Sequence, residues 1–126
     1  MKIVTLIARI LLGLICVVFG LNGFLNFLSM GPMPTGLAGQ FIGALAASHY
    51  FWLVAAIQVV GGALLLVNRF VPLALVLLGP IIVNIISYHV FLNHTGAGPA
   101  ALVTILWLIL FYGNRQHFSG IFVQRT

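Results

Sequence analysis

The chain has 126 residues, of which 63% are hydrophobic and only 4% charged, and it contains neither Asp nor Glu. A soluble domain carries about a quarter charged residues, so this composition excludes a water-exposed surface and indicates a protein that lies in lipid. The net charge of +5 comes from single basic residues rather than from a cluster, which excludes nucleic-acid binding and makes the lipid bilayer the expected partner.

Long apolar segments predict four transmembrane helices. The predicted spans are residues 3–28, 50–67, 70–92 and 97–113. At roughly 1.5 Å per residue, even the shortest of them nearly crosses a hydrocarbon core of about 30 Å. The first apolar run is too long for a signal-peptide core, so we expect it to be retained as a membrane helix. Residues 1–126 are therefore predicted to form one all-α domain, a four-transmembrane-helix bundle.

Small residues predict where helices approach each other closely. One face of the first span carries Gly13, Cys16, Gly20 and Gly23. The stretch from Gly36 to Ser48 is expected to form a short extra helix in the first outer loop, which lies at the outer surface or dips into the bundle, with a mobile outer loop as the alternative. Its Gly39 and Gly43 form a G-x-x-x-G pattern, which lets a helix backbone approach a neighbour closely.

Basic residues predict the orientation. Lys2, Arg9, Arg69, Arg115 and Arg125 fall at the N-terminus, the second connection and the C-terminal tail, which share one side in a four-span topology. The positive-inside rule then places both termini in the cytoplasm. Arg9 lies about two turns into the first span, so its long side chain is expected to extend back to the cytoplasmic interface.

Polar side chains in the first two spans are candidate site residues. Asn22 and Asn26 lie one helical turn apart, and each predicts either an interhelical hydrogen bond or the wall of a polar pocket. Gln58 shares a helical face with Gly61 and Gly62. We interpret Gln58 as an amide that hydrogen-bonds across a close helix contact, with a place in a ligand site as the alternative.

The third span carries a mid-helix proline and a polar face. Pro80 frees one backbone carbonyl, and Asn84, one turn later, is positioned to line the space that a kink would open. Ser87 lies on the same face. His89 lies about 140° from Asn84 on an ideal helix, so the two are not assigned to one pocket. Tyr88 adds a hydroxyl group next to His89.

The chain lacks the groups that most enzymes use. Without Asp or Glu it cannot form carboxylate acid–base pairs or carboxylate metal ligands, and it has no His-x-x-x-His pair, so no catalytic residue and no metal site is predicted. The remaining amide, imidazole and hydroxyl groups suit a neutral, largely apolar molecule with carbonyl oxygens, such as a quinone. The candidate contacts are Asn22, Asn26, Gln58, Asn84, Tyr88 and His89.

Four segments combine apolar residues with Gly, Asn, Arg and His at fixed positions, namely residues 9–13, 19–27, 61–72 and 80–89. Through these segments the chain resembles the DoxX family of small bacterial membrane proteins with four spans. It implies a multi-pass protein of the bacterial inner membrane, in a family associated with a quinol-oxidising or thiosulfate:quinone oxidoreductase system. The chain departs from the family at Gln58, where relatives often carry Glu, which weakens any implied proton chemistry.

Two specific functions are compatible with these features, and no sequence feature excludes a purely structural or assembly role. The first is an accessory, non-catalytic membrane subunit of a redox or respiratory complex linked to a quinone, which implies other membrane subunits or self-association as partners. The alternative is a stand-alone carrier or permeation protein for a small neutral or lipid-like solute, for which Pro80 and the glycine-rich faces could support a cavity between helices.

Overall fold

A computed structural model describes residues 2–25, 35–92 and 97–122. Over these residues the chain is helical and contains no strand, which confirms the all-α prediction. The helices are α1 (Lys2–Leu25), α2 (Gly36–Ala47), α3 (Tyr50–Leu66), α4 (Val71–Phe91) and α5 (Ala97–Gly113), followed by the short 3-10 helices η1 (Arg115–His117) and η2 (Ser119–Phe122). The helices match the predicted segments closely, and the expected end of the first span, near Leu28, lies outside the described residues.

Not every helix is long enough to cross a membrane by itself. Lys2–Asn22 of α1 and Val71–Phe91 of α4 are long and apolar enough, at 21 residues each. The pair formed by α2 and α3 also qualifies, but it is bent by 82° at its break, and α5 is apolar with 17 residues. Within the described ranges, the chain thus has two helices that can span a membrane, or three if the bent pair is one span.

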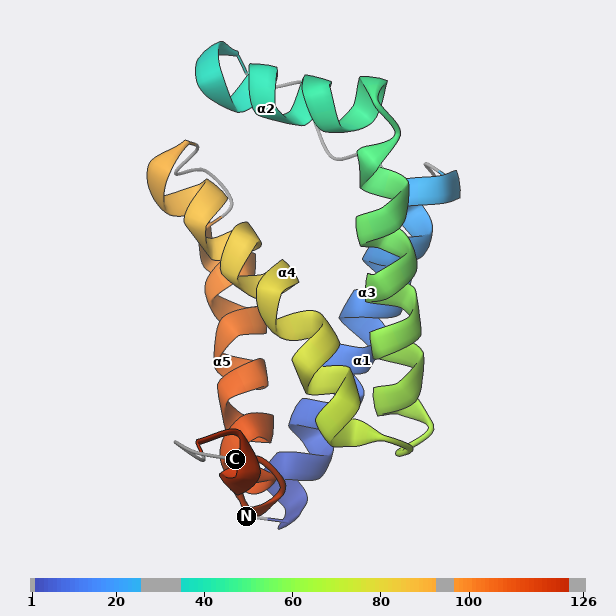
Figure 1. Ribbon diagram of the computed structural model, residues 1–126, viewed down its shortest axis with the longest axis vertical. Helices are drawn as coiled ribbons and strands as arrows, with labels where there is room; N and C mark the ends of the chain where they lie inside the picture. Colours follow the sequence, from blue (N-terminus) through green and yellow to red (C-terminus); the bar gives the residue numbers. More distant parts are fainter. Residues whose placement is uncertain (1, 26–34, 93–96, 123–126) are drawn as a thin grey trace.

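The four longer helices form a ring. α1 packs on α3, α3 on α4, α4 on α5, and α5 on α1. Neighbouring helices in this ring run in opposite directions (Figure 1). As a result, the start of α1, the turn from α3 to α4 and the end of α5 all lie at one end of the bundle, which we call the basal end. The opposite end, where α2 lies, is the distal end.

Glycines let α1 and α3 pack with their backbones close together. A Cβ atom added at Gly62 would lie 2.9 Å from both the Cys16 Cβ and the Gly13 carbonyl oxygen. A Cβ at Gly20 would lie 2.6 Å from a Val59 methyl group. Real Cβ atoms do not approach other atoms so closely, so only glycine permits this helix separation. The predicted small-residue face of α1 is therefore a packing seam at these positions.

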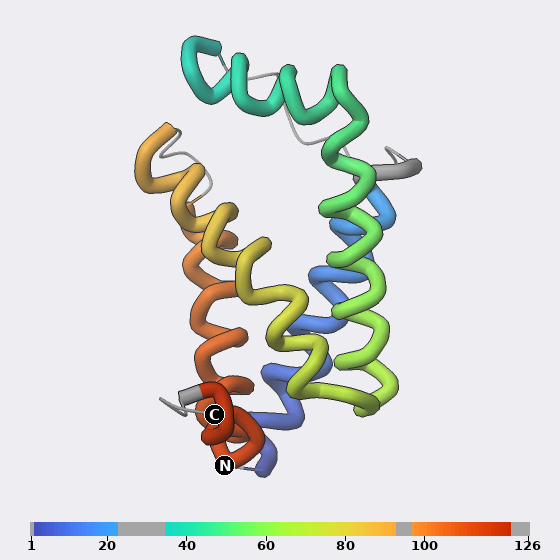
Figure 2. Tube along the Cα trace, in the orientation of Figure 1, coloured from blue at the N-terminus to red at the C-terminus, as the bar shows by residue number. Residues whose placement is uncertain are grey.

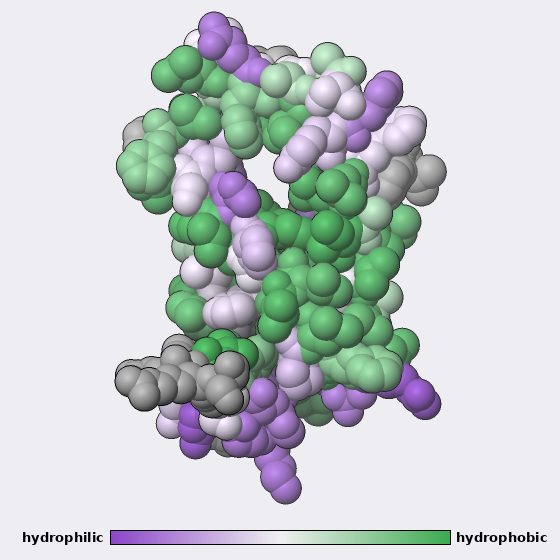
Figure 3. All heavy atoms as spheres, viewed as in Figure 1, coloured by the Kyte–Doolittle hydropathy of each residue, from purple (hydrophilic) through white to green (hydrophobic). Residues whose placement is uncertain are grey.

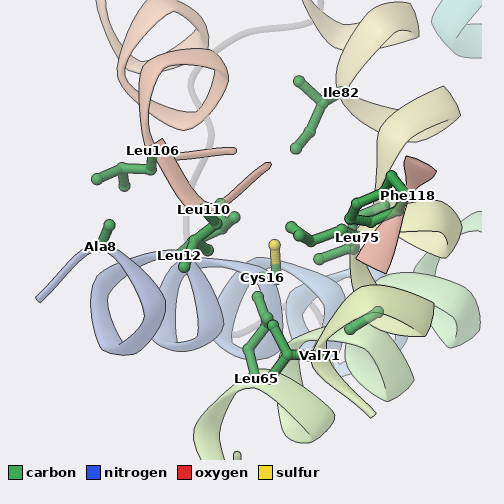
Figure 4. Close-up of a cluster of buried hydrophobic side chains, with 12 residues drawn as sticks. Ala8, Leu12, Cys16, Leu65, Val71, Leu75, Ile82, Leu106, Leu110 and Phe118 are labelled. Atoms are coloured by element: carbon green, nitrogen blue, oxygen red, sulfur yellow. The ribbon is translucent and has the colours of Figure 1, made fainter. Parts of the chain in front are cut away.

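The core of the bundle is a layer of leucines contributed by all four helices of the ring. Side chains from α1, α3, α4 and α5 point toward one another in this layer (Figure 4). The fully buried members are Leu12, Leu65, Leu75, Leu78 and Leu110. Phe118, which follows α5, covers the layer and lies 4.8 Å from the Phe111 ring. The Trp107 indole N–H also donates to the Leu75 carbonyl oxygen at 3.0 Å, which links α5 to α4.

Helix α2 lies across the distal end rather than along the bundle (Figure 1). The chain turns between α2 and α3 at His49, which adopts a left-handed conformation with φ of 60°. The Ser48 hydroxyl donates to the Ala44 carbonyl oxygen at 2.7 Å and helps to end α2. The extra helix is as predicted, and of the two expected positions it takes the outer one at Gly43, because a Cβ atom there would meet nothing within 4 Å. Only Ala38 of α2 is buried.

Candidate functional site

A cleft of about 290 Å³ lies between α2 and α4 at the distal end. It is lined by Phe41 of α2 and by Asn84, Ser87, Tyr88, Phe91 and Leu92 at the end of α4. The traces of α3 and α4 diverge toward this end (Figure 2), and the surface is hollowed below α2 (Figure 3). Because the helices separate here, polar side chains of α4 are not covered by a neighbouring helix.

Aromatic rings form one wall of the cleft. The Phe41 and Tyr88 rings are stacked, with centroids 5.7 Å apart and an angle of 30° between their planes. Tyr88 in turn meets the His89 ring edge-on, at a centroid distance of 5.1 Å. These contacts join α2 to α4 and present flat, apolar faces of the kind on which another planar ring can pack.

Asn84 and Ser87 provide the polar groups of the cleft. The Asn84 side-chain N–H donates to the Pro80 carbonyl oxygen at 2.8 Å, within its own helix. This bond uses one of the two amide N–H groups, and the amide also carries an acceptor oxygen. The Asn84 side chain is exposed and that of Ser87 is half-buried. The cleft thus combines aromatic surface with a few uncharged hydrogen-bonding groups, which suits a neutral ligand with carbonyl oxygens.

The structure separates the six candidate residues into groups. Asn84 and Tyr88 line the distal cleft, and His89 contacts Tyr88 without being part of the lining. Gln58 is elsewhere, since its side-chain N–H donates to the Cys16 carbonyl oxygen of α1 at 3.3 Å. Asn22 is buried, with 8% of its surface exposed, and does not line the cleft. Asn26 lies outside the described residues.

Gln58 therefore has the packing position that its neighbouring glycines predicted. It bonds across the α1–α3 seam, where Gly62 also lies against α1. Gly61, however, faces α4, because a Cβ atom there would lie 2.8 Å from Leu78. The two adjacent glycines thus serve two different helix contacts rather than one.

The cleft also contains residues that the sequence analysis did not propose as ligand contacts. Ser87 and Phe91 share a helical face with Asn84, so the spacing of polar residues in α4 carried a signal for Ser87. Phe41 had no such signal, because its place depends on how α2 folds over the end of α4.

A second and larger pocket, of about 530 Å³, opens at the basal end. Its walls come from the start of α1, the turn between α3 and α4, and the end of α5. The lining residues are Lys2, Thr5, Leu6, Arg9, Asn68, Val71, Leu110, Tyr112, Gly113, Asn114 and Arg115. Three basic residues thus surround one pocket, which their scattered positions in the sequence, interpreted above as a signal of membrane orientation, did not predict.

Metal-binding side chains are not clustered in the part of the chain that the structure describes. Among the residues that the structure describes, no group of three His or Cys side chains could hold a metal ion, and the sequence has no Asp or Glu.

Comparisons of this chain with protein-family models, with curated proteins and with solved structures gave no match. The geometry of the pockets is therefore the basis for a functional proposal.

Proposed function

We propose that the protein is a four-span membrane protein of the bacterial inner membrane, with the basal end in the cytoplasm. α3 and α5 are about 25 Å long at 1.5 Å per residue, and they pack along α1 and α4, which can span a membrane. A bilayer crossed by α1 and α4 would therefore also contain α3 and α5. Lys2, Arg69 and Arg115 flank helices at the basal end, which supports its cytoplasmic position.

Arg9 is consistent with the same orientation. It lies inside the first span, but its guanidinium donates to the carbonyl oxygens of Leu65 and Leu66 in the last turn of α3. These carbonyls belong to the last turn of α3 and carry the negative end of the helix dipole, and the Leu65 carbonyl oxygen also accepts from the Asn68 N–H at 3.3 Å. The charge of Arg9 is thus held near the basal interface rather than in the middle of the bilayer.

Labelling with a membrane-impermeant thiol reagent tests this topology. Cys16 is first replaced by Ala, and single cysteines are then introduced by Ser48→Cys at the distal end and Gln116→Cys at the basal end, both at exposed positions. In intact cells without an outer-membrane barrier, Ser48→Cys should be labelled, and Gln116→Cys should react only after lysis. The reverse pattern would contradict the proposed orientation.

The function that the distal cleft best supports is the binding of a quinone-like molecule by an accessory subunit of a redox complex. The observation that carries this proposal is the stacked pair of Phe41 and Tyr88 beside the amide of Asn84 and the hydroxyl of Ser87. A planar quinone ring can pack on the aromatic wall, and its carbonyl oxygens can accept hydrogen bonds from the polar groups. The resemblance to the DoxX family supports the same ligand class and the presence of partner subunits.

The chemistry of the side chains favours an accessory role over catalysis. A subunit that oxidises or reduces a quinone needs groups that take up and release protons. The chain has no carboxylate side chain, and the position where DoxX relatives often carry Glu is occupied by Gln58, which bonds within the α1–α3 seam. Electron and proton transfer would then be the work of a partner subunit.

The carrier hypothesis has less support from the packing. A carrier must let its ligand pass between the two sides of the membrane. The fully buried leucines of α1, α3, α4 and α5 fill the bundle below the distal cleft, and they include Leu12, Leu75 and Leu78. None of these leucines lines the cleft, and their close packing fills the middle of the bundle, which favours a binding site over a path.

Purification in a mild detergent, followed by organic extraction and mass spectrometry, tests the proposed ligand. The wild-type protein should retain a quinone, and Phe41→Ala should lose most of it because the aromatic wall is removed. Phe19→Ala is the matched control, since Phe19 is an exposed phenylalanine of α1 that does not line the cleft. A wild-type protein that carries neither a quinone nor partner subunits would overturn the proposal.

A further inference from the structure

The basal pocket concentrates positive charge that nothing in the chain's own side chains can neutralise. Lys2, Arg9 and Arg115 all line it, and the sequence contains no Asp or Glu. Three cations around one pocket repel each other, and a single bound anion would relieve that repulsion. The pocket volume of about 530 Å³ leaves room for a group as large as a phosphate ester.

The arginines of the pocket are held in place by backbone carbonyls. The Arg9 guanidinium binds the last turn of α3 through the Leu65 and Leu66 carbonyl oxygens. The Arg115 guanidinium donates to the Tyr112 carbonyl oxygen at 2.7 Å and lies 4.2 Å from the centre of the Tyr112 ring. Both sets of contacts use uncharged partners, so neither supplies a counter-charge to the guanidinium. A guanidinium has five N–H donors in one plane, which is why arginine binds phosphate oxygens well.

Polar uncharged groups complete the walls. Asn68 of the α3–α4 turn and Asn114 after α5 both line the pocket, and the Asn114 amide donates to the Leu110 carbonyl oxygen at 2.9 Å. Thr5 lies against Gly113 across the pocket, where a Cβ atom on the glycine would be 3.2 Å from the threonine hydroxyl. The pocket thus brings together α1, the α3–α4 turn and the segment after α5, with hydrogen-bonding groups from each.

We propose that the basal pocket binds a phosphate group, supplied either by the headgroup of an anionic phospholipid or by free phosphate. The position of the pocket is suited to a lipid, because it lies at the end of the bundle where the helices would meet the headgroup region. Basic pockets between membrane helices on the cytoplasmic side are a known type of site for anionic headgroups. This site is separate from the distal cleft and does not depend on the quinone proposal.

Native mass spectrometry of the protein in neutral detergent, with added phosphatidylglycerol or phosphatidylcholine, tests the lipid source. The wild type should retain phosphatidylglycerol in preference to phosphatidylcholine. Arg115→Gln should weaken phosphatidylglycerol binding on the order of fivefold, since one basic group near a charged surface contributes about that much. Arg115 is exposed, so this variant should fold. Arg69→Gln is the matched control, because it removes the same charge from the same end without touching the pocket.

Inorganic phosphate, titrated into the lipid-free protein while thermal unfolding is followed, tests the other source. If phosphate raises the unfolding temperature of the wild type but not of Arg115→Gln, and no lipid preference is seen, the ligand is a free phosphate. A lipid preference that depends on Arg115 identifies a headgroup instead. Equal losses in Arg115→Gln and Arg69→Gln would show a general effect of surface charge and would overturn the proposal. So would the absence of both effects in the wild type.

Discussion

The seam between α1 and α3 and the distal cleft between α2 and α4 use similar side chains in opposite ways. In the seam, Gly13 and Gly62 bring two backbones together, and the amide of Gln58 bonds from one helix to the other. At the distal cleft the space between the helices stays open, and the amide of Asn84 bonds to the Pro80 carbonyl oxygen of its own helix. The amide in the seam is therefore part of the packing, whereas the amide in the cleft is accessible to a ligand.

In this bundle the role of a polar residue depends on whether a neighbouring helix packs against it. A side-chain amide in lipid must find a hydrogen-bond partner, and a close neighbour supplies one in the backbone carbonyl of Cys16. Where α3 and α4 diverge, α4 instead turns its polar face toward the cleft below α2. Substitutions in the two regions should consequently affect different properties, stability in one and ligand binding in the other.

The largest effect is expected when the seam is forced apart. Gly62→Leu would place a side chain where a Cβ atom already lies 2.9 Å from Cys16 and from the Gly13 carbonyl oxygen. Backbone atoms cannot move aside as a side chain can, so α3 must shift away from α1. We expect a loss of about 3 kcal/mol in the free energy of unfolding, measured by thermal or denaturant unfolding in detergent.

Gly43→Leu is the control for this substitution. It makes the same change in α2, where an added Cβ atom meets nothing within 4 Å. Its unfolding temperature should stay near that of the wild type. If Gly62→Leu were as stable as Gly43→Leu, the seam would not depend on the close approach of α1 and α3.

Much of the bundle could be predicted from the sequence, because the relevant signals are local. Long apolar runs predicted the helices, and the spacing of small residues predicted a close-packing face of the first span at Gly13 and Gly20. That this face meets α3 could not be predicted from the spacing. The G-x-x-x-G pattern in α2 left open whether this helix lies at the outer surface or dips into the bundle, because the pattern permits close packing but does not supply a neighbour. Four spans and the cytoplasmic orientation stay predictions.

The pockets were harder to predict, because each is formed by segments far apart in the sequence. Asn84 and Tyr88 could be named from one helix, but Phe41 reaches them only through the 82° bend between α2 and α3. In the same way, Lys2, Arg9 and Arg115 meet only because α1 begins where α5 ends. Sequence spacing cannot show which ends of two helices come together.

A moderate effect is expected when the amide of the seam is removed. Gln58→Leu eliminates the hydrogen bond to the Cys16 carbonyl oxygen and should lower the free energy of unfolding by about 1 kcal/mol, the usual value for such a bond within a membrane. Ligand retention at the distal cleft should be unchanged, as measured by extraction of the purified protein. Loss of the ligand at unchanged stability would instead place Gln58 in the binding site.

The smallest effect on stability, together with the largest effect on binding, is expected for Asn84→Leu. The Asn84 side chain is exposed and bonds to a carbonyl in its own helix, so its removal should change the free energy of unfolding by no more than about 0.5 kcal/mol. The same change removes the only amide of the distal cleft among the residues described there and should sharply reduce quinone retention.

Gln58→Leu and Asn84→Leu make the same chemical change of an amide to an apolar side chain. Measured side by side, they should give opposite results, with stability lost in the first variant and ligand lost in the second. If both variants lost stability alike and kept the ligand, Asn84 would be a packing residue, and the contrast between the seam and the distal cleft would fail.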